Sequence, residues 1–249
     1  MVKNVGLVWL KDDFRLTKNS ALIEATKKHD NVVAFFLYKQ RKFESQEAQK
    51  WWLYKSLEEF KKKLANYNIS LEIIKVNSYK NFFEKIFLKK NFSIYWNRTY
   101  EPKYLKFDEF LSKNFKINKI NFHIFKGNIL NEFSEVKKND GTPFKVFTPF
   151  WKHAEKVYLD KIPSKEKKIS KCLKKISYFE NTISEKQIYP NKDWVKKFDD
   201  YWIPGEENAL KVLKKFISGR IIKYSEARNF PNIIGTSKLS PFIKHGQIH

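Results

Sequence analysis

Two hydrophobic periodicities alternate along the first 130 residues of the chain. Short apolar runs, rich in β-branched and aromatic residues, are typical of strands that are buried on both faces of a sheet. Such runs occupy residues 4–10, 31–38, 70–76, 92–96 and 120–125. The segments between them carry apolar residues every three or four positions, as helices with one buried face do. The alternation predicts an α/β fold, with a five-stranded parallel sheet and helices on both of its faces.

The alternation stops after residue 130. A turn cluster precedes one amphipathic helix over residues 147–158. Residues 160–200 are rich in Lys and Ser and have few periodic apolar positions, which indicates a linker on the surface of the first domain. A helix with an acidic first turn begins near residue 205, and helices and loops continue from there.

These patterns divide the chain into three parts. Residues 1–130 are expected to form the α/β domain, residues 131–200 a helix and an interdomain linker, and residues 201–249 the start of a helical domain. The last helical pattern begins only a few residues before residue 249. We therefore expect this sequence to be the N-terminal portion of a longer protein.

Composition indicates a folded chain outside the membrane. Apolar residues make up 42% of the 249 residues and charged residues 31%. No apolar run approaches the ~20 residues of a membrane span, and the N-terminus lacks a signal-peptide core. We therefore expect a cytoplasmic protein without membrane contact. A single cysteine, Cys172, excludes an internal disulfide and a cysteine-based zinc site, and we interpret it as a free thiol.

The net charge of +23 has two interpretations. A basic surface attracts nucleic-acid phosphates through the release of counterions. However, Lys, Asn, Ile, Phe and Tyr are abundant together, and their codons are all rich in A and T. Only five of the 50 basic residues are Arg. A biased codon composition would raise both the charge and the aromatic content, so charge alone leaves a nucleic-acid partner open.

Several common functional motifs are absent from the sequence. The seven glycines are too widely spaced for the glycine-rich phosphate loops of dinucleotide-binding proteins and nucleoside triphosphatases. The five histidines have no metal-binding spacing, and we expect no metal site.

Several other stretches match one family of proteins. Residues 9–22 (WLKDDFRLTKNSAL) follow its opening pattern, and residues 95–102 (YWNRTYEP) and 146–151 (VFTPFW) repeat shorter blocks of it. The most specific stretch, residues 202–248, contains WIPGE, GRIIKYSEARNFP and GTSKLSPFIKHGQI. The chain thus resembles the DNA photolyases and cryptochromes, and its last block is similar to the start of the flavin domain of class I photolyases. The resemblance implies a Rossmann-like antenna domain, a linker, and the first helices of an all-α FAD-binding domain.

The last block carries the candidate cofactor-binding residues. In the family, the loop before a helix holds the FAD diphosphate. The matching residues here are Thr236, Ser237, Lys238, Leu239 and Ser240. Hydroxyls, backbone N–H groups and an ammonium next to a helix start do favour an anion. We predict Ser240 as the N-cap of that helix and Pro241 as its first residue.

Two further residues match family positions. Tyr224 stands at the spacing of a tyrosine that contacts FAD, and Arg228 matches an arginine that contacts DNA. Their four-residue spacing predicts that both lie on the same side of a short helix. A guanidinium suits a phosphate because it offers paired N–H donors.

The first motif departs from the family pattern at three positions. Lys11 and Asp12 replace arginines, Lys18 replaces the usual Asp before Asn19, and we interpret all three as surface changes. Asp13 and Arg15 keep their family identity and are expected to brace the loop rather than to take part in chemistry.

The antenna domain of this family often holds a second chromophore, a folate or a deazaflavin. Folate-binding members carry an Asn-Glu pair where this chain has Lys103 and Tyr104, which argues against a folate at that position. The identity of a second chromophore stays open.

The resemblance implies light-dependent repair of cyclobutane pyrimidine dimers in DNA by electron transfer from photoexcited reduced FAD. The partner would be damaged DNA, and the full-length protein would be a monomer. We expect no catalytic residue within residues 1–249 and no activity from this chain alone. Two alternatives stay open. One is a cryptochrome-type blue-light flavin receptor, and the other is a free-standing nucleotide-binding module, which would leave an apolar face exposed on residues 202–249.

Overall fold

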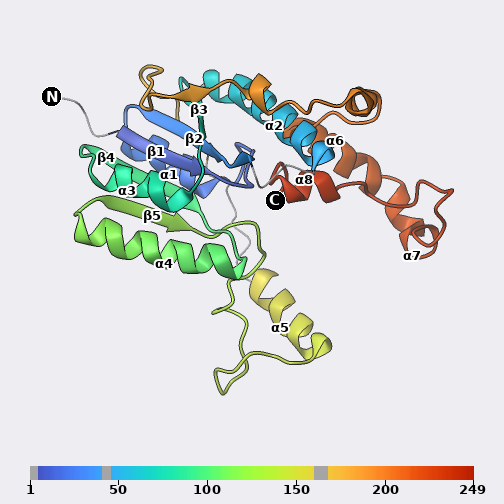
Figure 1. Cartoon of the computed structure of the whole chain (residues 1–249). Helices are drawn as coiled ribbons and strands as arrows, with labels where there is room; N and C mark the ends of the chain where they lie inside the picture. Colours follow the sequence, from blue (N-terminus) through green and yellow to red (C-terminus); the bar gives the residue numbers. More distant parts are fainter. Residues whose placement is uncertain (1–4, 41–45, 160–167) are drawn as a thin grey trace.

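The computed structural model of the protein describes residues 5–40, 46–159 and 168–249. A sheet lies at its centre and helices cover both faces (Figure 1). The strands are β1 (Val5–Leu10), β2 (Val32–Tyr38), β3 (Ser70–Lys75), β4 (Phe92–Asn97), β5 (Asn121–Phe125) and β6 (Thr182–Ile183). The helices are α1 (Ser20–Lys28), α2 (Glu47–Ala65), α3 (Tyr79–Phe87), α4 (Pro102–Ile117), α5 (Phe147–Leu159), α6 (Glu206–Ile217), α7 (Tyr224–Ala227) and α8 (Ser240–Lys244), with the short 3-10 helices η2 (Glu185–Ile188), η3 (Asp193–Asp200) and η4 (Arg220–Lys223).

The sheet has the strand order β5-β4-β1-β2-β3-β6. Strands β1 to β5 run parallel, which confirms the predicted α/β fold. The prediction of five strands was one short, because β6 pairs antiparallel with β3. Strand β6 is two residues long and lies within the predicted linker. A segment this short has no readable periodicity, and it is a strand only because it lies along the edge of the sheet.

Two separate hydrophobic cores cover the two faces of the sheet. Successive strand residues point to opposite faces. Val8 and Leu10 of β1 therefore pack with α1 and α2, whereas Leu7 and Trp9 pack with α3 and α4. Every residue of β1 and β2 is buried, which explains why both strands are continuous apolar runs rather than alternating ones.

The predicted linker lies along the sheet and is tied to it by a buried carboxylate. Glu72 of β3 accepts hydrogen bonds from the backbone N–H groups of Tyr178 (3.0 Å) and Phe179 (2.8 Å). Cys172 is a buried free thiol in the core beside α1 and α2, as the sequence indicated. Residues 160–167 of the predicted linker lie outside the described residues.

The loop after β1 is braced by the two residues that the sequence indicated. The Asp13 carboxylate accepts a hydrogen bond from the Asn97 amide at the end of β4 (2.7 Å). The Arg15 guanidinium donates to the side-chain oxygen of Asn128 (2.8 Å) and to the carbonyl oxygen of Gly246 (3.0 Å). These contacts join one loop to the neighbouring strand and to the C-terminal turn.

A third hydrophobic cluster joins the C-terminal helices to α2. Trp51 and Trp52 at the start of α2 are both buried against residues that include Phe242 of α8. Adjacent residues on a helix point in different directions, so the sequence alone requires only one of these two rings to face a core. The other is covered because α6 and α8 pack on the start of α2. Gln247, fully buried, accepts a hydrogen bond from the Trp52 indole (3.2 Å).

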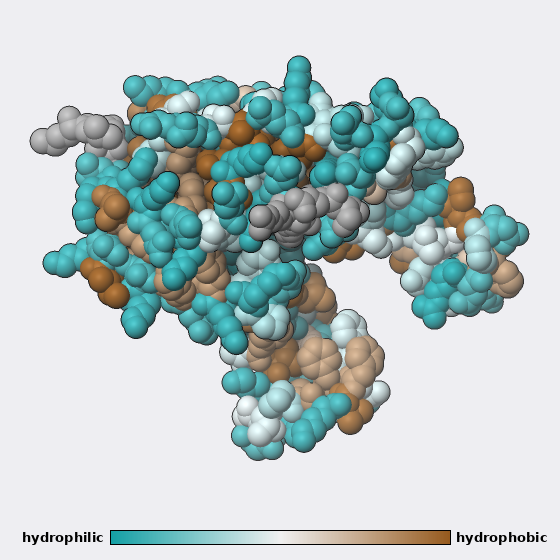
Figure 2. Space-filling view, in the orientation of Figure 1, coloured by the Kyte–Doolittle hydropathy of each residue, from teal (hydrophilic) through white to brown (hydrophobic). Residues whose placement is uncertain are grey.

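Other apolar side chains stay exposed. Helix α5 stands away from the sheet, and Phe147 and Trp151 on it are exposed (Figures 1 and 2). Further exposed apolar residues follow α6, among them Ile222, Phe230 and Ile234. Figure 2 shows the corresponding hydrophobic colouring around both projecting regions. Exposed apolar side chains therefore occur within residues 202–249, where a free-standing module would leave an apolar face uncovered.

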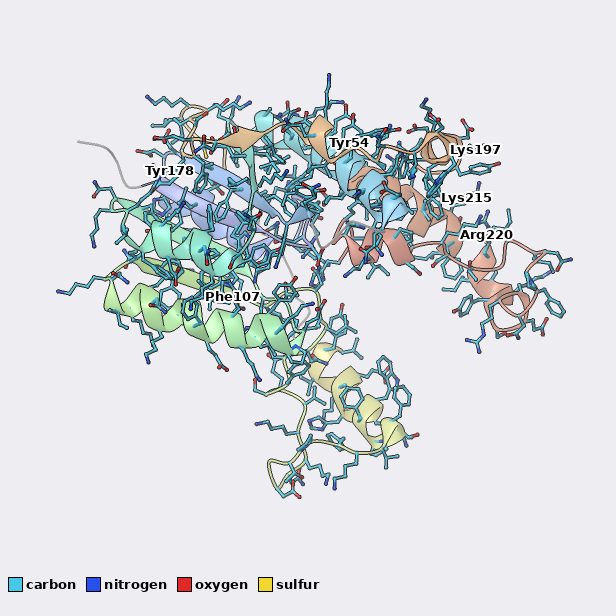
Figure 3. All side chains as sticks on the ribbon, viewed as in Figure 1. Tyr54, Phe107, Tyr178, Lys197, Lys215 and Arg220 are labelled. Atoms are coloured by element: carbon cyan, nitrogen blue, oxygen red, sulfur yellow. The ribbon has the colours of Figure 1, made fainter. Side chains whose placement is uncertain are left out.

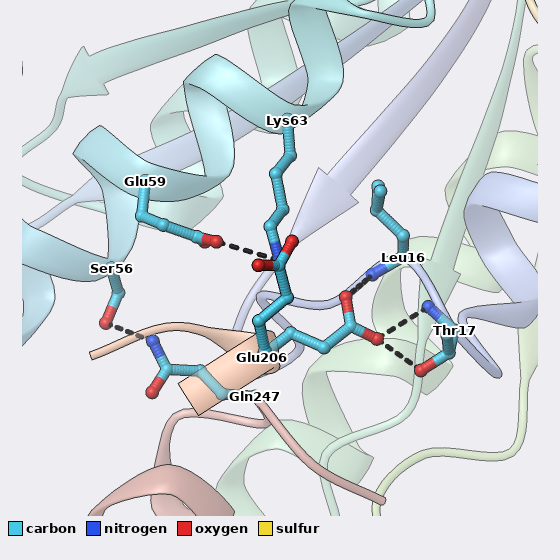
Figure 4. Close-up of polar contacts among 8 residues, drawn as sticks. Leu16, Thr17, Ser56, Glu59, Lys63, Glu206 and Gln247 are labelled. Carbon is cyan, nitrogen blue, oxygen red and sulfur yellow. Dashed lines mark hydrogen bonds and ion pairs between the residues drawn. The ribbon is translucent and has the colours of Figure 1, made fainter. Parts of the chain in front are cut away.

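A buried carboxylate also fixes α6 on the loop after β1. Glu206, in the first turn of α6, is 5% exposed. Its carboxylate accepts hydrogen bonds from the backbone N–H groups of Leu16 (2.8 Å) and Thr17 (3.0 Å), and from the Thr17 hydroxyl (Figure 4). Hydrogen bonds to a charged acceptor are stronger than neutral ones. This contact sets the position of α6 relative to the sheet.

We expect Glu206→Gln to lower the free energy of unfolding of the protein by about 2–3 kcal/mol, measured by urea denaturation. The glutamine side chain has the size of the glutamate side chain but carries no charge. Its NH₂ group is a hydrogen-bond donor, so it cannot accept from the N–H groups of the loop.

Glu207→Gln is the matched control. Glu207 is the next residue, its side chain is 72% exposed, and it pairs with Lys63 at 3.3 Å. We expect it to change the free energy of unfolding by less than about 0.5 kcal/mol. Equal losses in the two variants would show that the buried hydrogen bonds of Glu206 do not hold α6.

Candidate functional site

A cavity of about 420 Å³ lies beside α6 and the loop that precedes α8. Ser237 and Lys238 line it from the loop, and Lys211, Lys215 and Arg220 line it from α6 and η4. Its other walls are mostly aromatic and apolar, with Trp202 and Phe242 among them, and Asn208 adds an amide. The cavity therefore combines cations, a hydroxyl and ring surfaces in one hollow.

The loop before α8 differs from its predicted form at the helix start. Leu239, not Ser240, is the N-cap of α8, and Ser240 is the first helical residue. Lys238 has a left-handed backbone (φ 55°), and Leu239 directly after it is buried in the third hydrophobic cluster. This inward turn starts the helix one residue earlier than the sequence indicated. The Ser237 hydroxyl oxygen accepts a hydrogen bond from the Leu239 N–H (3.4 Å).

The structure brings only some of the predicted site residues together. Ser237 and Lys238 line the cavity, Thr236 and Ser240 are exposed at the two ends of the loop, and Leu239 faces the hydrophobic cluster. Leu239 thus holds the loop in place by packing, while Ser237 and Lys238 line the cavity.

Tyr224 and Arg228 lie together on and next to α7, outside the lining of this cavity. The Arg228 guanidinium is 5.5 Å from the centre of the Tyr224 ring, which confirms that both side chains lie on one side of the short helix. The Tyr224 ring also meets Phe216 of α6 edge to face, with their centres 5.7 Å apart.

Sequence reasoning missed the three cations that α6 and η4 bring to the cavity. Lys211 and Lys215 stand four residues apart, so they lie on one face of α6. This spacing is visible in the sequence, but lysine pairs are too common in this chain for it to be informative. With Lys238 and Arg220 the cavity has four cations, and no Asp or Glu occurs among the described residues that line it.

This donor set fits the FAD that the resemblance implies. Ammonium, guanidinium and hydroxyl groups suit the charge and oxygens of a diphosphate. The aromatic and apolar walls suit a ring system, as ligand pockets usually do. The fit concerns the loop residues Ser237 and Lys238 together with the cations that face them.

Lys11 corrects an expectation from the sequence, because it is not a surface residue. Its side chain is 10% exposed, and its ammonium lies 3.3 Å from the Asp108 carboxylate and 4.3 Å from the centre of the Trp9 ring. Burial lowers the pKa of Lys11 and raises the pKa of Asp108, and the ion pair between them opposes both changes. Asp108 is on α4, far along the chain, so no local pattern predicts this burial.

The crevice at the carboxyl ends of β1 and β4 is nearly filled. Parallel sheets commonly bind ligands at this point of the strand order. Here the described residues enclose only about 30 Å³, bordered by Tyr79 and Tyr104 among others. That volume holds about one water molecule, whereas ligand pockets are roughly 300–1,000 Å³. Burial raises the pKa of Tyr79, as expected in a closed site. The hollow that these described residues leave is too small for a folate or a deazaflavin.

In the described ranges 5–40, 46–159 and 168–249, no helix combines the length and the apolar character that a membrane span needs. No group of three or more His, Cys, Asp or Glu side chains within the same ranges is arranged to hold a metal ion.

Comparison with known proteins agrees with the fold and the motifs. The family model described as DNA photolyase matches residues 6–167. A deoxyribodipyrimidine photo-lyase of Agrobacterium fabrum is 30% identical over 243 residues, covering 97% of this chain and 50% of that protein. Cryptochrome-2 of Arabidopsis thaliana is 26% identical over 256 residues, covering 97% of this chain and 41% of that protein.

A solved structure extends the likeness to the whole chain. The crystal structure of a bacterial class III photolyase from Agrobacterium tumefaciens superimposes with a TM-score of 0.84 at 28% identity. The match covers all of this chain and 52% of the photolyase. The chain thus spans about half the length of the relatives it matches, and the family model alone accounts for more than half of its residues. This chain belongs to the DNA photolyase family.

Proposed function

We propose that this chain contributes part of the FAD site of a deoxyribodipyrimidine photolyase, an enzyme that splits cyclobutane pyrimidine dimers in DNA with light. The observation that carries the proposal is the cavity in which Ser237 and Lys238, at the predicted diphosphate positions, meet three further cations. A relative that matches 97% of the chain is named a deoxyribodipyrimidine photo-lyase, which supports the same assignment.

The residues of the loop would hold the diphosphate of the cofactor. When bound, reduced FAD absorbs blue light and then supplies the electron that splits the dimer. The Ser237 hydroxyl would donate a hydrogen bond to a phosphate oxygen, and the Lys238 ammonium would neutralise its charge. Thr236 and Ser240, exposed on either side, would extend the cradle. Buried Leu239 fixes the loop before any ligand arrives, which lowers the entropy cost of binding.

Tyr224 and Arg228 would act beside the cavity. Tyr224 is 38% exposed, and we assign it to a contact with FAD at the rim. The Arg228 guanidinium lies over the Tyr224 ring, and the ring leaves the N–H donors at the edge of the guanidinium available to a DNA phosphate. The net charge of +23 would help to attract damaged DNA to this face.

The finer assignments are also proposals. We infer a cytoplasmic enzyme that is a monomer at full length. Residues 202–248 support a class I assignment, whereas the solved photolyase that superimposes on the whole chain is described as class III, so the subclass stays a prediction. A second chromophore, whether a folate or a deazaflavin, would need a place other than the closed crevice beside Tyr104.

A cryptochrome-type blue-light receptor is the second candidate. Cryptochrome-2 of Arabidopsis thaliana also matches 97% of the chain, the same share as the photolyase relative. A receptor would use the same cofactor cavity without splitting dimers.

We expect the full-length protein, loaded with reduced FAD, to split pyrimidine dimers in an irradiated oligonucleotide under blue light and not in the dark. Chromatography of the oligonucleotide would measure the loss of dimers. Retention of every dimer by a protein that has bound FAD would refute the repair function and favour the receptor.

We expect Arg228→Gln to weaken binding of dimer-containing DNA about tenfold. We also expect it to reduce the slope of log affinity against log salt concentration by about 1, the value for one phosphate contact. Fluorescence anisotropy at several salt concentrations would measure both quantities. Lys103→Gln removes one exposed charge from α4 and should change affinity less than about twofold. Equal effects of the two substitutions would mean that Arg228 adds only general charge.

A further inference from the structure

We propose that a groove on the α/β domain, between α3 and the segment before β6, binds single-stranded nucleic acid. The groove has a volume of about 470 Å³, and none of its described lining residues also lines the cavity beside α6. Figure 3 shows Tyr178, which directly precedes the groove residue Phe179, at the opposite end of the view from Lys215 and Arg220 of the cavity. The groove is therefore separate from the proposed flavin site, and the inference does not depend on that site.

The groove follows one side of α3. Its lining residues in and next to this helix recur every three or four positions, so they share one face. These residues are Ser78, Asn81, Phe82, Lys85, Ile86 and Lys89. From Ser78 to Ile86 the chain rises roughly 12 Å, at about 1.5 Å per residue. The end of β3 and residues 179–181 complete the lining. An elongated lining of this kind suits a segment of a polymer chain.

Two phenylalanine rings form the aromatic part of the groove. The ring centres of Phe82 and Phe179 are 5.7 Å apart, and Phe179 also packs on the buried ring of Phe35, with centres 5.0 Å apart. Both groove rings are half-buried, so each leaves part of its surface to the groove. The hydrogen bond from the Phe179 N–H to the Glu72 carboxylate fixes this segment against the sheet. The rings are therefore held in place before a ligand arrives, and nucleobases stack on such surfaces.

Three lysines line the groove together with these rings. They are Lys75, Lys85 and Lys89. Within the part of the chain that the structure describes, no ion pair joins any of them to a carboxylate, whereas Lys80 on the same helix pairs with Glu84 at 3.8 Å. One carboxylate, Glu180, also lines the groove, so the cations outnumber it. Ammonium groups without acidic partners attract phosphates, and binding is strengthened by the counterions that the nucleic acid releases.

This combination of groups favours a single strand as the occupant. Phosphates would meet the lysines, and bases would cover the rings of Phe82 and Phe179. Three amides in the lining could hydrogen-bond to base edges, those of Asn77, Asn81 and Asn181. The bases of a duplex are stacked on one another, so a duplex offers its backbone and base edges but no free base face. An acidic peptide would match the lysines but would supply no flat ring for the aromatic surface.

The test measures binding of a short fluorescein-labelled oligothymidylate without dimers to the full-length protein in the dark. The variant is K75Q/K85Q/K89Q. We expect its dissociation constant to rise at least about tenfold. The slope of log affinity against log salt concentration should fall by about 2, because each phosphate contact to a single strand contributes about 0.7. Fluorescence anisotropy at several salt concentrations would measure both quantities.

Two further variants separate the groove from general charge. K106Q/K113Q/K116Q removes the same number of charges from exposed positions on α4 outside the lining, and it should change affinity less than about twofold. F82L keeps an apolar side chain but removes a ring. It should weaken binding about fivefold and leave the salt slope unchanged, because stacking rather than charge is lost.

Cross-linking locates the strand without any substitution. An oligonucleotide that contains 5-iodouracil would be cross-linked by ultraviolet light to the unchanged full-length protein, and the modified peptides would be identified by mass spectrometry. We expect the cross-link on peptides that contain Phe82 or Phe179. Cross-links confined to peptides outside residues 74–89 and 179–181 would overturn the inference. This measurement decides if a substituted protein fails to fold.

Three other outcomes would also overturn the inference. Unchanged affinity in K75Q/K85Q/K89Q, or equal losses in the two triple variants, would mean that the groove adds only general charge. An equal loss for a duplex of the same length would assign the lysines to backbone contacts alone. A polyglutamate peptide that binds as tightly as the oligonucleotide, with the same loss in the variant, would assign the groove to an acidic protein partner. The proposed function is unaffected by each result, because its test is the splitting of dimers.

Discussion

Buried backbone N–H groups in the loop after β1 must find acceptors, and the C-terminal part of the chain supplies them. The Glu206 carboxylate takes the N–H groups of Leu16 and Thr17, and the carbonyl oxygen of His245 takes the N–H of Phe14 (3.2 Å). An unpaired buried N–H costs about as much as a lost hydrogen bond. Satisfying this one loop therefore fixes both α6 and the turn after α8 against the sheet. Helices α6 and α8 both contribute residues to the lining of the cavity.

Close backbone contact at Gly246 tightens the same junction. Gly246 has a left-handed backbone (φ 58°), and a Cβ at this position would lie 1.9 Å from the carbonyl oxygen of Asp12. Only glycine tolerates both conditions. The Arg15 guanidinium then reaches the Gly246 carbonyl oxygen, which makes the guanidinium part of the same joint. The position of the TSKLS loop thus depends on contacts made some distance from the cavity.

Charge is distributed differently in the two halves of the molecule. In the α/β half, buried carboxylates such as Glu72 and Asp108 have donor or cationic partners. Around the cavity, Lys211 and Lys215 have no carboxylate among its described lining residues. A chain with a net charge of +23 cannot neutralise every cation internally. Four of its cations line this hollow.

The sequence by itself determined the five long strands, the helices between them and the family, because periodicity and motif spacing are local properties of the chain. It also indicated Ser237 and Lys238 as candidate site residues, and both line the cavity. Only the tertiary structure decided that a sixth strand forms, that Leu239 rather than Ser240 caps α8, and that Lys11 is buried beside Asp108. It also decided that the cations of α6 line the same cavity as Ser237 and Lys238. Each of these depends on contacts between residues far apart in sequence. Such contacts leave no local pattern, and the abundance of lysine hides the few whose position matters.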